Sequence, residues 1–329
     1  MGLFSWLQRV FSKVFAARPS SDPTSSVAMT GAEKDYPAPR WDKQELLRRL
    51  NLSQLKIIYT VRGVNPQTTN ELDPGLIPVG YWWHTIPKRT GGTRQLYSPN
   101  PRLKLLHKLL LRRVFAKLKV HPGAKGFRRG ESTFSHAKLH IGQAVVVRID
   151  IKNFFPKTHS DRVYSYLRMI GWNRESARLM VELCCRKKGL PQGAPTSPIL
   201  SNVVNYQMDA RLAGLAVKSK ASYSRYADDL IFSFAEDNRR FIRGVVRRVA
   251  RILFDFGYQM NKSKLKVMRQ HNRQVITGLV VNEKVQLPRQ TRRWLRAVEH
   301  HMKNGKEATL TREQLAGWKA YQQSDKGQS

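Results

Sequence analysis

Two adjacent carboxylates, Asp228 and Asp229, stand between a tyrosine-rich run at 223–226 and an apolar run at 230–234. Both runs have the length and composition of β-strands, so the sequence predicts a hairpin with the two acids at or beside its turn. Like charges this close to buried strands repel each other and resist desolvation, and a divalent cation removes both costs. Mg²⁺ prefers carboxylate oxygens and keeps coordination positions for substrate phosphates. A turn that merely ends a hairpin is the alternative when the dipeptide is taken alone.

A third carboxylate, Asp150, lies toward the end of a nearly continuous β-branched run that begins at Ala144. Such a run is typical of a central buried strand, in which a charge needs compensation. Asp150 can meet Asp228 only if the two elements are neighbours in one sheet. That arrangement would provide a two-metal site, with ions roughly 3.5–4 Å apart bridging the attacking and leaving oxygens.

The composition indicates the class of partner. The 329 residues include 59 Lys and Arg against 23 Asp and Glu, a formal net charge of +36. Such an excess opposes compaction unless a polyanion neutralises it, so nucleic acid is the expected partner. A non-catalytic RNA-binding protein would carry the same charge. The charge therefore says nothing about chemistry.

Cysteine usage and hydropathy favour a cytoplasmic location. The two cysteines, Cys184 and Cys185, are adjacent, which gives neither a disulfide framework nor metal-ligand spacing and fits a reducing cytosol. No apolar run approaches the length of a membrane span, and no cleavable signal peptide is evident. Membrane association is therefore not expected of the main body.

Several further elements surround the acidic residues. Residues 2–18 form a basic amphipathic pattern followed by a Pro- and Ser-rich linker to 40, and this helix could dock on a partner protein, lie on a membrane surface or pack on its own body. Residues 82–97 predict a basic hairpin around Gly91-Gly92, followed by a basic amphipathic helix over 101–118. The Lys and Arg side chains of both elements could bind phosphates or simply face water, and the sequence does not distinguish the two.

The stretch 189–198 (GLPQGAPTSP) predicts a rigid turn that opens a helix. A glycine-rich turn that carries an amide side chain at a helix start is suited to hold a nucleobase or sugar edge. A helix-capping loop is the alternative.

Together and in this order, Asp150 with Phe155, the Gly-Leu-Pro-Gln-Gly stretch and Tyr226-Ala-Asp-Asp229 resemble the palm motifs of reverse transcriptases. The resemblance extends from about 39 to 321. It implies an α+β right-hand polymerase, with fingers, a palm of antiparallel sheet and helices, and a short helical thumb. We expect these segments in order: an N-terminal helix and linker at 1–40, fingers at 41–149, palm at 150–282 with finger segments in about 160–195, and thumb at 283–329.

The resemblance also implies the roles of individual residues. Asp150 and Asp228 ligate two Mg²⁺ ions, Asp229 supports the site, and the Ile151 carbonyl completes one coordination shell. The implied metal set is therefore Asp150, Ile151, Asp228 and Asp229, and the catalytic residues are its three aspartates. The family lysine near the leaving pyrophosphate matches Lys264, or Lys262 if the alignment slips.

On the substrate side, Phe155 matches the aromatic residue that blocks a ribose 2′-OH and so selects dNTPs. Gln192 matches the residue that contacts the incoming nucleotide. Arg94 and Lys88 match the cations of the finger hairpin that hold the triphosphate.

Within the family, the chain is most similar to bacterial retron reverse transcriptases. Their Asn-Ala-x-x-His signature is matched at 136–140, with His136 in place of the asparagine, and their Val-Thr-Gly signature by Ile276-Thr277-Gly278. The segment 292–301 resembles the retron thumb helix, with basic residues facing a duplex. The resemblance thus gives RNA-binding roles to Ala137, His140, Thr277, Gly278, Arg292, Arg296 and His300.

Retron enzymes copy part of a structured RNA encoded beside them into single-stranded DNA, starting from the 2′-OH of an internal guanosine, and act with an effector protein in antiphage defence. The resemblance therefore implies a cognate RNA, the RNA–DNA product, dNTPs and an effector as partners, with a second copy of the enzyme as a further candidate. Two rival functions remain: another reverse transcriptase, of the group II intron or diversity-generating type, and an idle RNA-binding scaffold.

Overall fold

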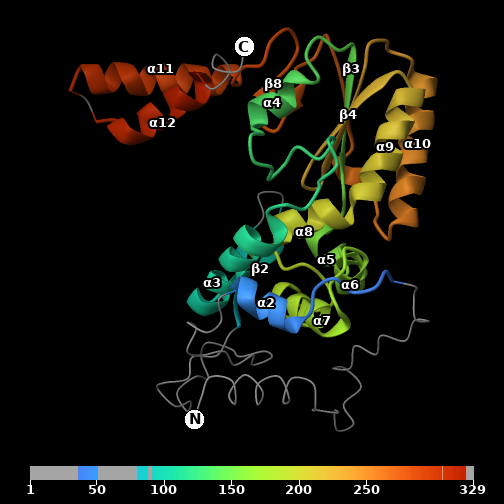
Figure 1. The fold of residues 1–329 in the computed structure, drawn as a ribbon. Helices are drawn as coiled ribbons and strands as arrows, with labels where there is room; N and C mark the ends of the chain where they lie inside the picture. Colours follow the sequence, from blue (N-terminus) through green and yellow to red (C-terminus); the bar gives the residue numbers. More distant parts are fainter. Residues whose placement is uncertain (1–35, 51–79, 88–90, 306, 324–329) are drawn as a thin grey trace. The chain divides into compact units, whose positions relative to one another are not determined.

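The computed structural model describes residues 36–50, 80–87, 91–305 and 307–323 (Figure 1). They fall into two compact units, which are described separately. The first comprises Met1–Lys119 and Phe155–Val204, and the second comprises Val120–Phe154 and Asn205–Ser329, each within the described ranges. The boundaries of these units differ from those of the expected segments. Residues 120–149, expected in the fingers, and residues 283–329, expected in the thumb, both belong to the second unit, which contains the larger sheet. The assignment of fingers, palm and thumb stays a prediction, and the expected N-terminal helix lies outside the described residues.

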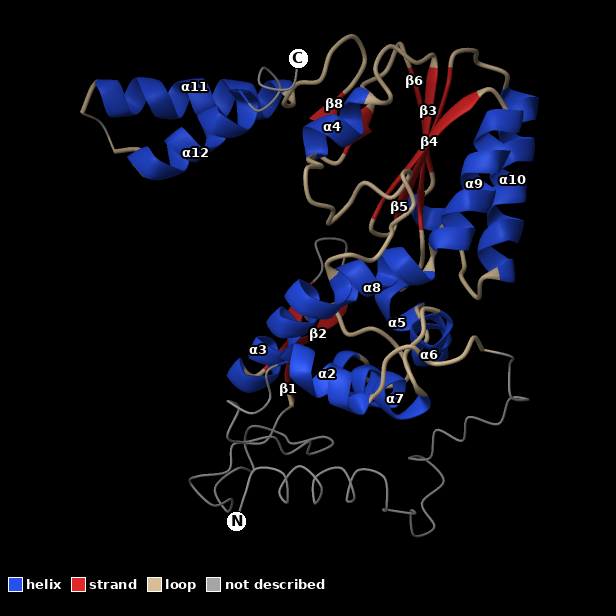
Figure 2. Cartoon of the chain, in the orientation of Figure 1, coloured by secondary structure: helices blue, strands red, loops and turns tan. Residues whose placement is uncertain are grey.

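The second unit is built on a four-stranded antiparallel sheet (Figure 2). Its strands, in sheet order, are β4 (Ala221–Tyr226), β5 (Asp229–Phe234), β3 (Val145–Asp150) and β6 (Lys266–Arg269). β3 is central and buried along nearly its whole length, which explains its continuous β-branched sequence. Two helices, α9 (Tyr206–Lys218) and α10 (Arg239–Asp255), cover one face of this sheet in Figure 1.

The other face is covered by α4 (Thr133–Lys138) and a small hairpin of β7 (Val275–Ile276) and β8 (Leu279–Val280). A capping box between Ser132 and Ser135 starts α4. After this hairpin come two helices, α11 (Arg289–Lys303) and α12 (Arg312–Gln323). One buried apolar cluster joins these elements to the sheet, with members that include Phe134, Val146, Ile231, Ile276, Leu287, Leu295 and Leu315.

The first unit contains the expected basic hairpin, formed by β1 (Tyr81–Pro87) and β2 (Thr93–Pro99). Its helices are α2 (Lys43–Leu50), α3 (Pro101–Leu109), α6 (Ser160–Met169), α7 (Arg174–Cys184) and α8 (Ser197–Val204), with a π-helical turn at Leu110–Phe115 and most of the short α5 (Phe154–Lys157). The helix expected at 101–118 is therefore α-helical and then π-helical. The α+β class predicted from the sequence is confirmed.

Within the described residues, none of the helices is both long and apolar enough to cross a bilayer.

Candidate active site

The hairpin predicted around Asp228 and Asp229 is confirmed: β4 and β5 pair from Ala221 with Phe234 to Tyr226 with Asp229. Ala227 and Asp228 form the two-residue turn, and Ala227 has φ 55°. A non-glycine residue in the left-handed region costs of order 1–3 kcal/mol and persists where the surroundings enforce it. Here Arg225 donates from Nη1 to the Ala227 carbonyl at 3.1 Å, which holds the turn in place.

Asp150 joins the two hairpin acids at the same end of the sheet. β3 pairs with β5, and Asp150 is the register partner of Asp229. Directly after Asp150, the Ile151 N–H donates to the Asp228 carbonyl at 2.9 Å. The condition for Asp150 and Asp228 to meet, neighbouring elements in one sheet, is therefore fulfilled, and the three carboxylates come from adjacent segments of one unit.

Two cations bind two of these carboxylates. Arg148 donates from Nε and Nη2 to the two oxygens of Asp229, at 2.9 and 2.7 Å, and so fixes that carboxylate with a planar fork. Lys264 donates from Nζ to Oδ2 of Asp150 at 2.8 Å. Asp228 has no ion pair among the described residues. Burial raises the pKa of the Asp228 carboxyl, and the negative charges of Asp229 and Asp150 raise it further.

These donors fit a hard divalent cation. Carboxylate and carbonyl oxygens are the ligands that Mg²⁺ prefers, and a half-buried Asp228 beside two like charges is relieved by a cation. In the described part of the chain, no three His, Cys, Asp or Glu side chains gather around one point. Because Arg148 already binds both oxygens of Asp229, Asp150 and Asp228 are the carboxylates that fit a cation best.

The geometry also separates the two lysine candidates. Lys262–Lys264 form a short 3-10 turn, and the Asn261 N–H donates to the Asp150 carbonyl at 2.8 Å, which fixes this turn to the end of β3. The ammonium that reaches Asp150 belongs to Lys264. Lys264 therefore lies at the acidic site, and its role beside the pyrophosphate stays a prediction.

A second ion pair, which the sequence reasoning missed, lies beneath the hairpin. Arg225 of β4 binds Asp209 of α9 through Nε at 2.7 Å and Nη2 at 2.6 Å, and both side chains are 0% exposed. The Tyr223 hydroxyl donates to the same carboxylate at 2.7 Å. The Arg225 guanidinium also lies over the Phe154 ring, 5.5 Å from its centre. The sequence did contain one signal for this ion pair. Arg225 lies in a strand, and a cation that is buried in a strand requires an acid nearby.

Two histidines of the expected retron signature also support the hairpin. His136 and His140 each make a 2.7 Å hydrogen bond from Nε2 to the Ser224 hydroxyl of β4, and His140 Nδ1 bonds Ser233 of β5 at 2.7 Å. The His136 ring stacks on Tyr226, which directly precedes the turn. Burial lowers the pKa of His136 to about 4 and that of His140 to about 3, so both are neutral at pH 7.

The residues expected to bind RNA separate into three groups. Ala137 and His140 are fully buried, so their side chains contact protein and not a surface that RNA could reach. Thr277 and Gly278 form the turn between β7 and β8. The basic residues of α11 are exposed: Arg292, Arg296 and His300.

Arg94, Phe155 and Gln192, which are expected to contact the nucleotide, belong to the first unit. Lys88 lies outside the described residues. Arg94 is exposed on β2, and Phe155 and Gln192 are half-buried. The Gln192 carbonyl accepts from the Tyr97 N–H of β2 at 2.7 Å, and the Phe155 carbonyl accepts from Leu190 at 3.1 Å. Three separate segments thus meet at the Gln192 loop.

Two glycines allow this close approach. A Cβ at Gly189 would collide with the carbonyl oxygen of Pro156. Gly193 has φ 109°, and a Cβ there would lie 2.9 Å from the Tyr97 carbonyl oxygen. Both positions therefore require glycine.

Comparison with known proteins identifies the family. A family model described as "Reverse transcriptase (RNA-dependent DNA polymerase)" matches residues 86–296, well over half of the chain. The retron Mx65 reverse transcriptase of Myxococcus xanthus is 36% identical over 259 residues, covering 73% of this chain and 60% of that protein. The retron Mx162 reverse transcriptase of the same organism is 36% identical over 271 residues, covering 72% and 56%.

The retron Ec86 reverse transcriptase of Escherichia coli is 32% identical over 229 residues, covering 69% of this chain and 70% of that protein. The chain therefore belongs to the reverse transcriptase family and, within it, to the retron reverse transcriptases. It spans less than two thirds of the length of the two Myxococcus relatives. The three aspartates lie at one end of the antiparallel sheet, and the assignment of this sheet to a polymerase palm stays a prediction.

Proposed function

We propose that the protein is an RNA-directed DNA polymerase of the retron type, which copies a cognate structured RNA into single-stranded DNA. The observation that carries this proposal is the register pairing of Asp150 with Asp229, which brings Asp228 at the hairpin turn beside the end of β3. Nucleotidyl transfer requires carboxylates at such a point, next to the primer terminus and the incoming triphosphate. Membership of the family supports the same assignment.

We propose that Asp150, Asp228 and the Ile151 carbonyl hold two Mg²⁺ ions, which would activate the attacking hydroxyl and neutralise the leaving pyrophosphate. The chain's own residues prepare this site. Arg148 fixes the Asp229 carboxylate, which keeps it from turning toward Asp228. Lys264 neutralises Asp150 in the absence of the ions and would be free to meet the pyrophosphate once they bind.

Selection of the nucleotide is proposed for the first unit. Phe155 would exclude a ribose 2′-OH, Gln192 would contact the incoming nucleotide, and Arg94 with Lys88 would hold the triphosphate. What supports this grouping is the backbone bonding that joins Phe155, the Gln192 loop and the strand of Arg94.

For the nucleic acid, we propose a cognate RNA that presents the 2′-OH of an internal guanosine to the aspartates, giving a branched RNA–DNA product. The same carboxylate site serves any hydroxyl held in line with the α-phosphate, so positioning decides where synthesis starts. The net charge of +36 is suited to folded RNA and to the growing heteroduplex. An effector protein and a role in antiphage defence, in the cytoplasm, complete the proposal.

The test uses Asp228→Asn, with the purified full-length protein and the RNA that copurifies with it. We expect loss of DNA synthesis with RNA affinity nearly unchanged, because binding rests mainly on Lys and Arg contacts to phosphates. Synthesis at a comparable rate would contradict the metal assignment. Absence of synthesis by the wild type would favour an RNA-binding scaffold.

The retron type is tested on the product of the wild-type enzyme. A DNA 5′ end released from RNA only by a 2′,5′-debranching enzyme is the expected result. A free DNA 5′ end, or one joined to a 3′-terminal RNA primer, would point to another kind of reverse transcriptase.

A further inference from the structure

Helix α10 of the second unit has an arginine-rich outer surface that is separate from the three aspartates and from α11. The buried side chains of this helix are all apolar: Ile242, Val245, Val249, Ile252 and Leu253. Its six arginines are all exposed: Arg239, Arg240, Arg243, Arg247, Arg248 and Arg251. These six side chains are called the arginine face of α10.

α10 extends along one face of the sheet toward the aspartates (Figure 1). β5 runs from Asp229 to Phe234, away from the acidic site, and α10 begins five residues later and runs back. Shortly after the helix ends, the Gln259 carbonyl accepts from the Lys152 N–H at 2.9 Å, two residues beyond Asp150. The arginine face therefore forms a path along the outside of the unit that ends near the acidic site.

Four of the arginines have a regular spacing. Arg239, Arg243, Arg247 and Arg251 recur at every fourth residue, so neighbours are about 6 Å apart along the axis and the row is about 18 Å long. Like charges at this spacing destabilise a helix, and cations in the first turn oppose the helix dipole. The arrangement therefore costs stability, and a ligand with a row of negative charges would relieve that cost.

Few acids oppose these charges. The acid of α10 is Asp255, which binds Arg211 at 2.8 Å and Arg251 at 3.3 Å. The other five arginines of the helix form no ion pair with any of the described residues. A guanidinium offers a phosphate two parallel donors, which a lysine ammonium cannot do, and this helix contains no lysine. A surface that only faces water usually mixes both signs of charge, so α10 favours a phosphate-bearing partner.

An aromatic ring lies within the same row. Phe254 follows Arg251 by three residues and Arg247 by seven, so the three share one side of the helix. Its side chain is 67% exposed. Surfaces that bind single-stranded nucleic acid combine cations for the backbone with aromatic rings on which bases stack. Because the bases of a duplex already stack on one another, this ring favours a single strand.

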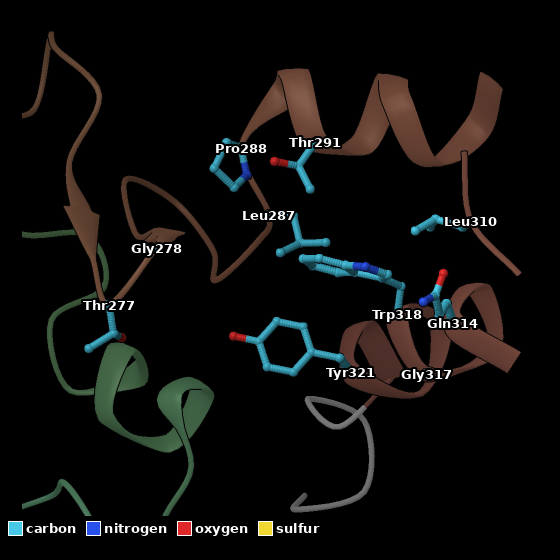
Figure 3. A pocket seen from close by; sticks show the side chains of 10 residues that line it. All are labelled: Thr277, Gly278, Leu287, Pro288, Thr291, Leu310, Gln314, Gly317, Trp318 and Tyr321. Atoms are coloured by element: carbon cyan, nitrogen blue, oxygen red, sulfur yellow. The ribbon is translucent and has the colours of Figure 1, made fainter. Parts of the chain in front are cut away.

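The large pocket of the unit differs from this surface. It measures about 660 Å³ and lies between the β7–β8 turn and the helices α11 and α12 (Figure 3). Its walls include the side chains of Leu287, Trp318 and Tyr321, and among the described residues that line it none is charged. A phosphate chain therefore has no ionic partner inside the pocket, whereas α10 offers it a continuous row of guanidinium groups.

We propose that α10 binds a single-stranded segment of the nucleic acid that enters or leaves the acidic site, with phosphates on the arginine face and a base on Phe254. The proposal rests on the proposed polymerase function and deepens it, because it gives one strand a path along the helix-covered face of the sheet. RNA and DNA share the required chemistry. An anionic lipid surface is the competing occupant, and the regular spacing of the arginines favours a chain whose phosphates also recur regularly.

The test adds a single-stranded extension to a short primer–template duplex and measures the affinity of the full-length protein by fluorescence anisotropy. The extension has about 15 nucleotides, near the upper end of the site size of single-strand-binding folds. Separate arms carry the extension as RNA on the template, as DNA on the primer, or not at all, and so identify which strand α10 binds. Vesicles of anionic phospholipid form a further arm.

The test variant is Arg243→Gln/Arg247→Gln. Its matched control, Arg273→Gln/Lys284→Gln, removes the same charge at two exposed positions outside α10. Phe254→Ala and Phe254→Trp form a second pair. All these side chains are exposed, so thermal unfolding should be nearly unchanged in every variant.

We expect an extension to raise the affinity of the wild type by about tenfold, as stacking of one base would give. Arg243→Gln/Arg247→Gln should lose this gain, and the slope of log affinity against log salt should fall by about 1.4, or about 0.7 for each phosphate contact. The control should keep the gain and the slope. Phe254→Ala should lose most of the gain with the slope unchanged, and Phe254→Trp should keep both.

Equal affinity with and without the extensions in the wild type, or a gain that survives Arg243→Gln/Arg247→Gln, would overturn the proposal. Loss of the gain in both double variants would attribute it to net charge and overturn it as well. Vesicle binding lost in the test variant, with no gain from the extensions, would assign the face to lipid instead. DNA synthesis on the unextended duplex is measured in parallel: synthesis without a gain contradicts this proposal alone, and a gain without synthesis contradicts the polymerase proposal alone.

Discussion

Two groups of charged side chains in the second unit differ in how completely their charges are paired. Beneath the hairpin, Arg225 and Asp209 are both 0% exposed and joined by two short hydrogen bonds. At the hairpin tip, three carboxylates face two cations, of which Arg148 is 34% and Lys264 is 49% exposed. The buried pair is neutral and rigid. The tip retains one negative charge, on Asp228, and side chains that water or a ligand can reach.

This difference suggests a division of roles. The Arg225–Asp209 pair holds β4 against α9, and Arg225 also fixes the carbonyl of the strained Ala227. The tip is left short of positive charge at the point where substrate phosphates and their cations are proposed to arrive. Variants of the buried pair should therefore mainly lower stability, and variants of the hairpin tip should mainly lower activity.

The largest effect is expected from breaking the buried pair. Arg225→Met leaves Asp209 buried without its cation, which typically costs about 3–5 kcal/mol. Urea denaturation should show this loss, and the double variant Arg225→Met/Asp209→Leu should recover much of it, since no charge is then left unpaired. A loss below about 1 kcal/mol in the single variant would mean that water or another group compensates Asp209.

Adjacent phenylalanines give the next contrast. Phe154 is buried against Arg225 and Tyr258, whereas Phe155 is half-buried. Phe154→Ala should lower the free energy of unfolding by about 3–5 kcal/mol. Phe155→Ala or Phe155→Val should change stability far less and admit ribonucleotides into the product, measured by primer extension with dNTPs and NTPs in competition. If the Phe155 variants discriminate as well as the wild type, the sugar is selected elsewhere.

The histidines beneath the hairpin predict a pH dependence. The native pKa of His136 is about 4, below its ordinary value of 6.5, so its contribution to stability is complete above 6.5 and is lost as pH falls through about 4. The shift corresponds to about 3 kcal/mol. His136→Asn should therefore flatten the dependence of unfolding free energy on pH between 6.5 and 4. Equal slopes for variant and wild type would show that His136 does not resist protonation.

The smallest effect is expected at the tip. The native pKa of Asp228 is raised, so ionising this group opposes folding, and its contribution to stability is lost as pH rises through that value. Without divalent cations at pH 7, Asp228→Asn should raise the free energy of unfolding by on the order of 1 kcal/mol. Added Mg²⁺ should stabilise the wild type more than the variant. A destabilised variant would assign Asp228 to the structural group.

The sequence predicted the acidic residues at the hairpin tip better than the buried side-chain contacts beneath the hairpin. Alternating and β-branched runs identify strands, so the hairpin and the strand that ends at Asp150 followed from local pattern, whereas the pairing of these two elements was implied only by the resemblance to the palm motifs. Arg148 and Asp229, or Arg225 and Asp209, pair across distances that no local pattern encodes. His136 and His140, four residues apart on a short helix, look the same whether they face RNA or the core. Their burial became visible only with the serines of β4 and β5 in place.

Gly189 and Gly193 restrict how far the backbone of the loop between them can change in evolution. Any side chain at Gly189 would collide with the backbone that follows Phe155, and one at Gly193 would press on the backbone of Tyr97. If this loop contacts the nucleotide as proposed, a change of nucleotide preference should not come from reshaping its backbone. Such a change should instead accumulate in the side chains of Phe155, Gln192 and Arg94, where a residue can be replaced without moving the backbone that supports its neighbours.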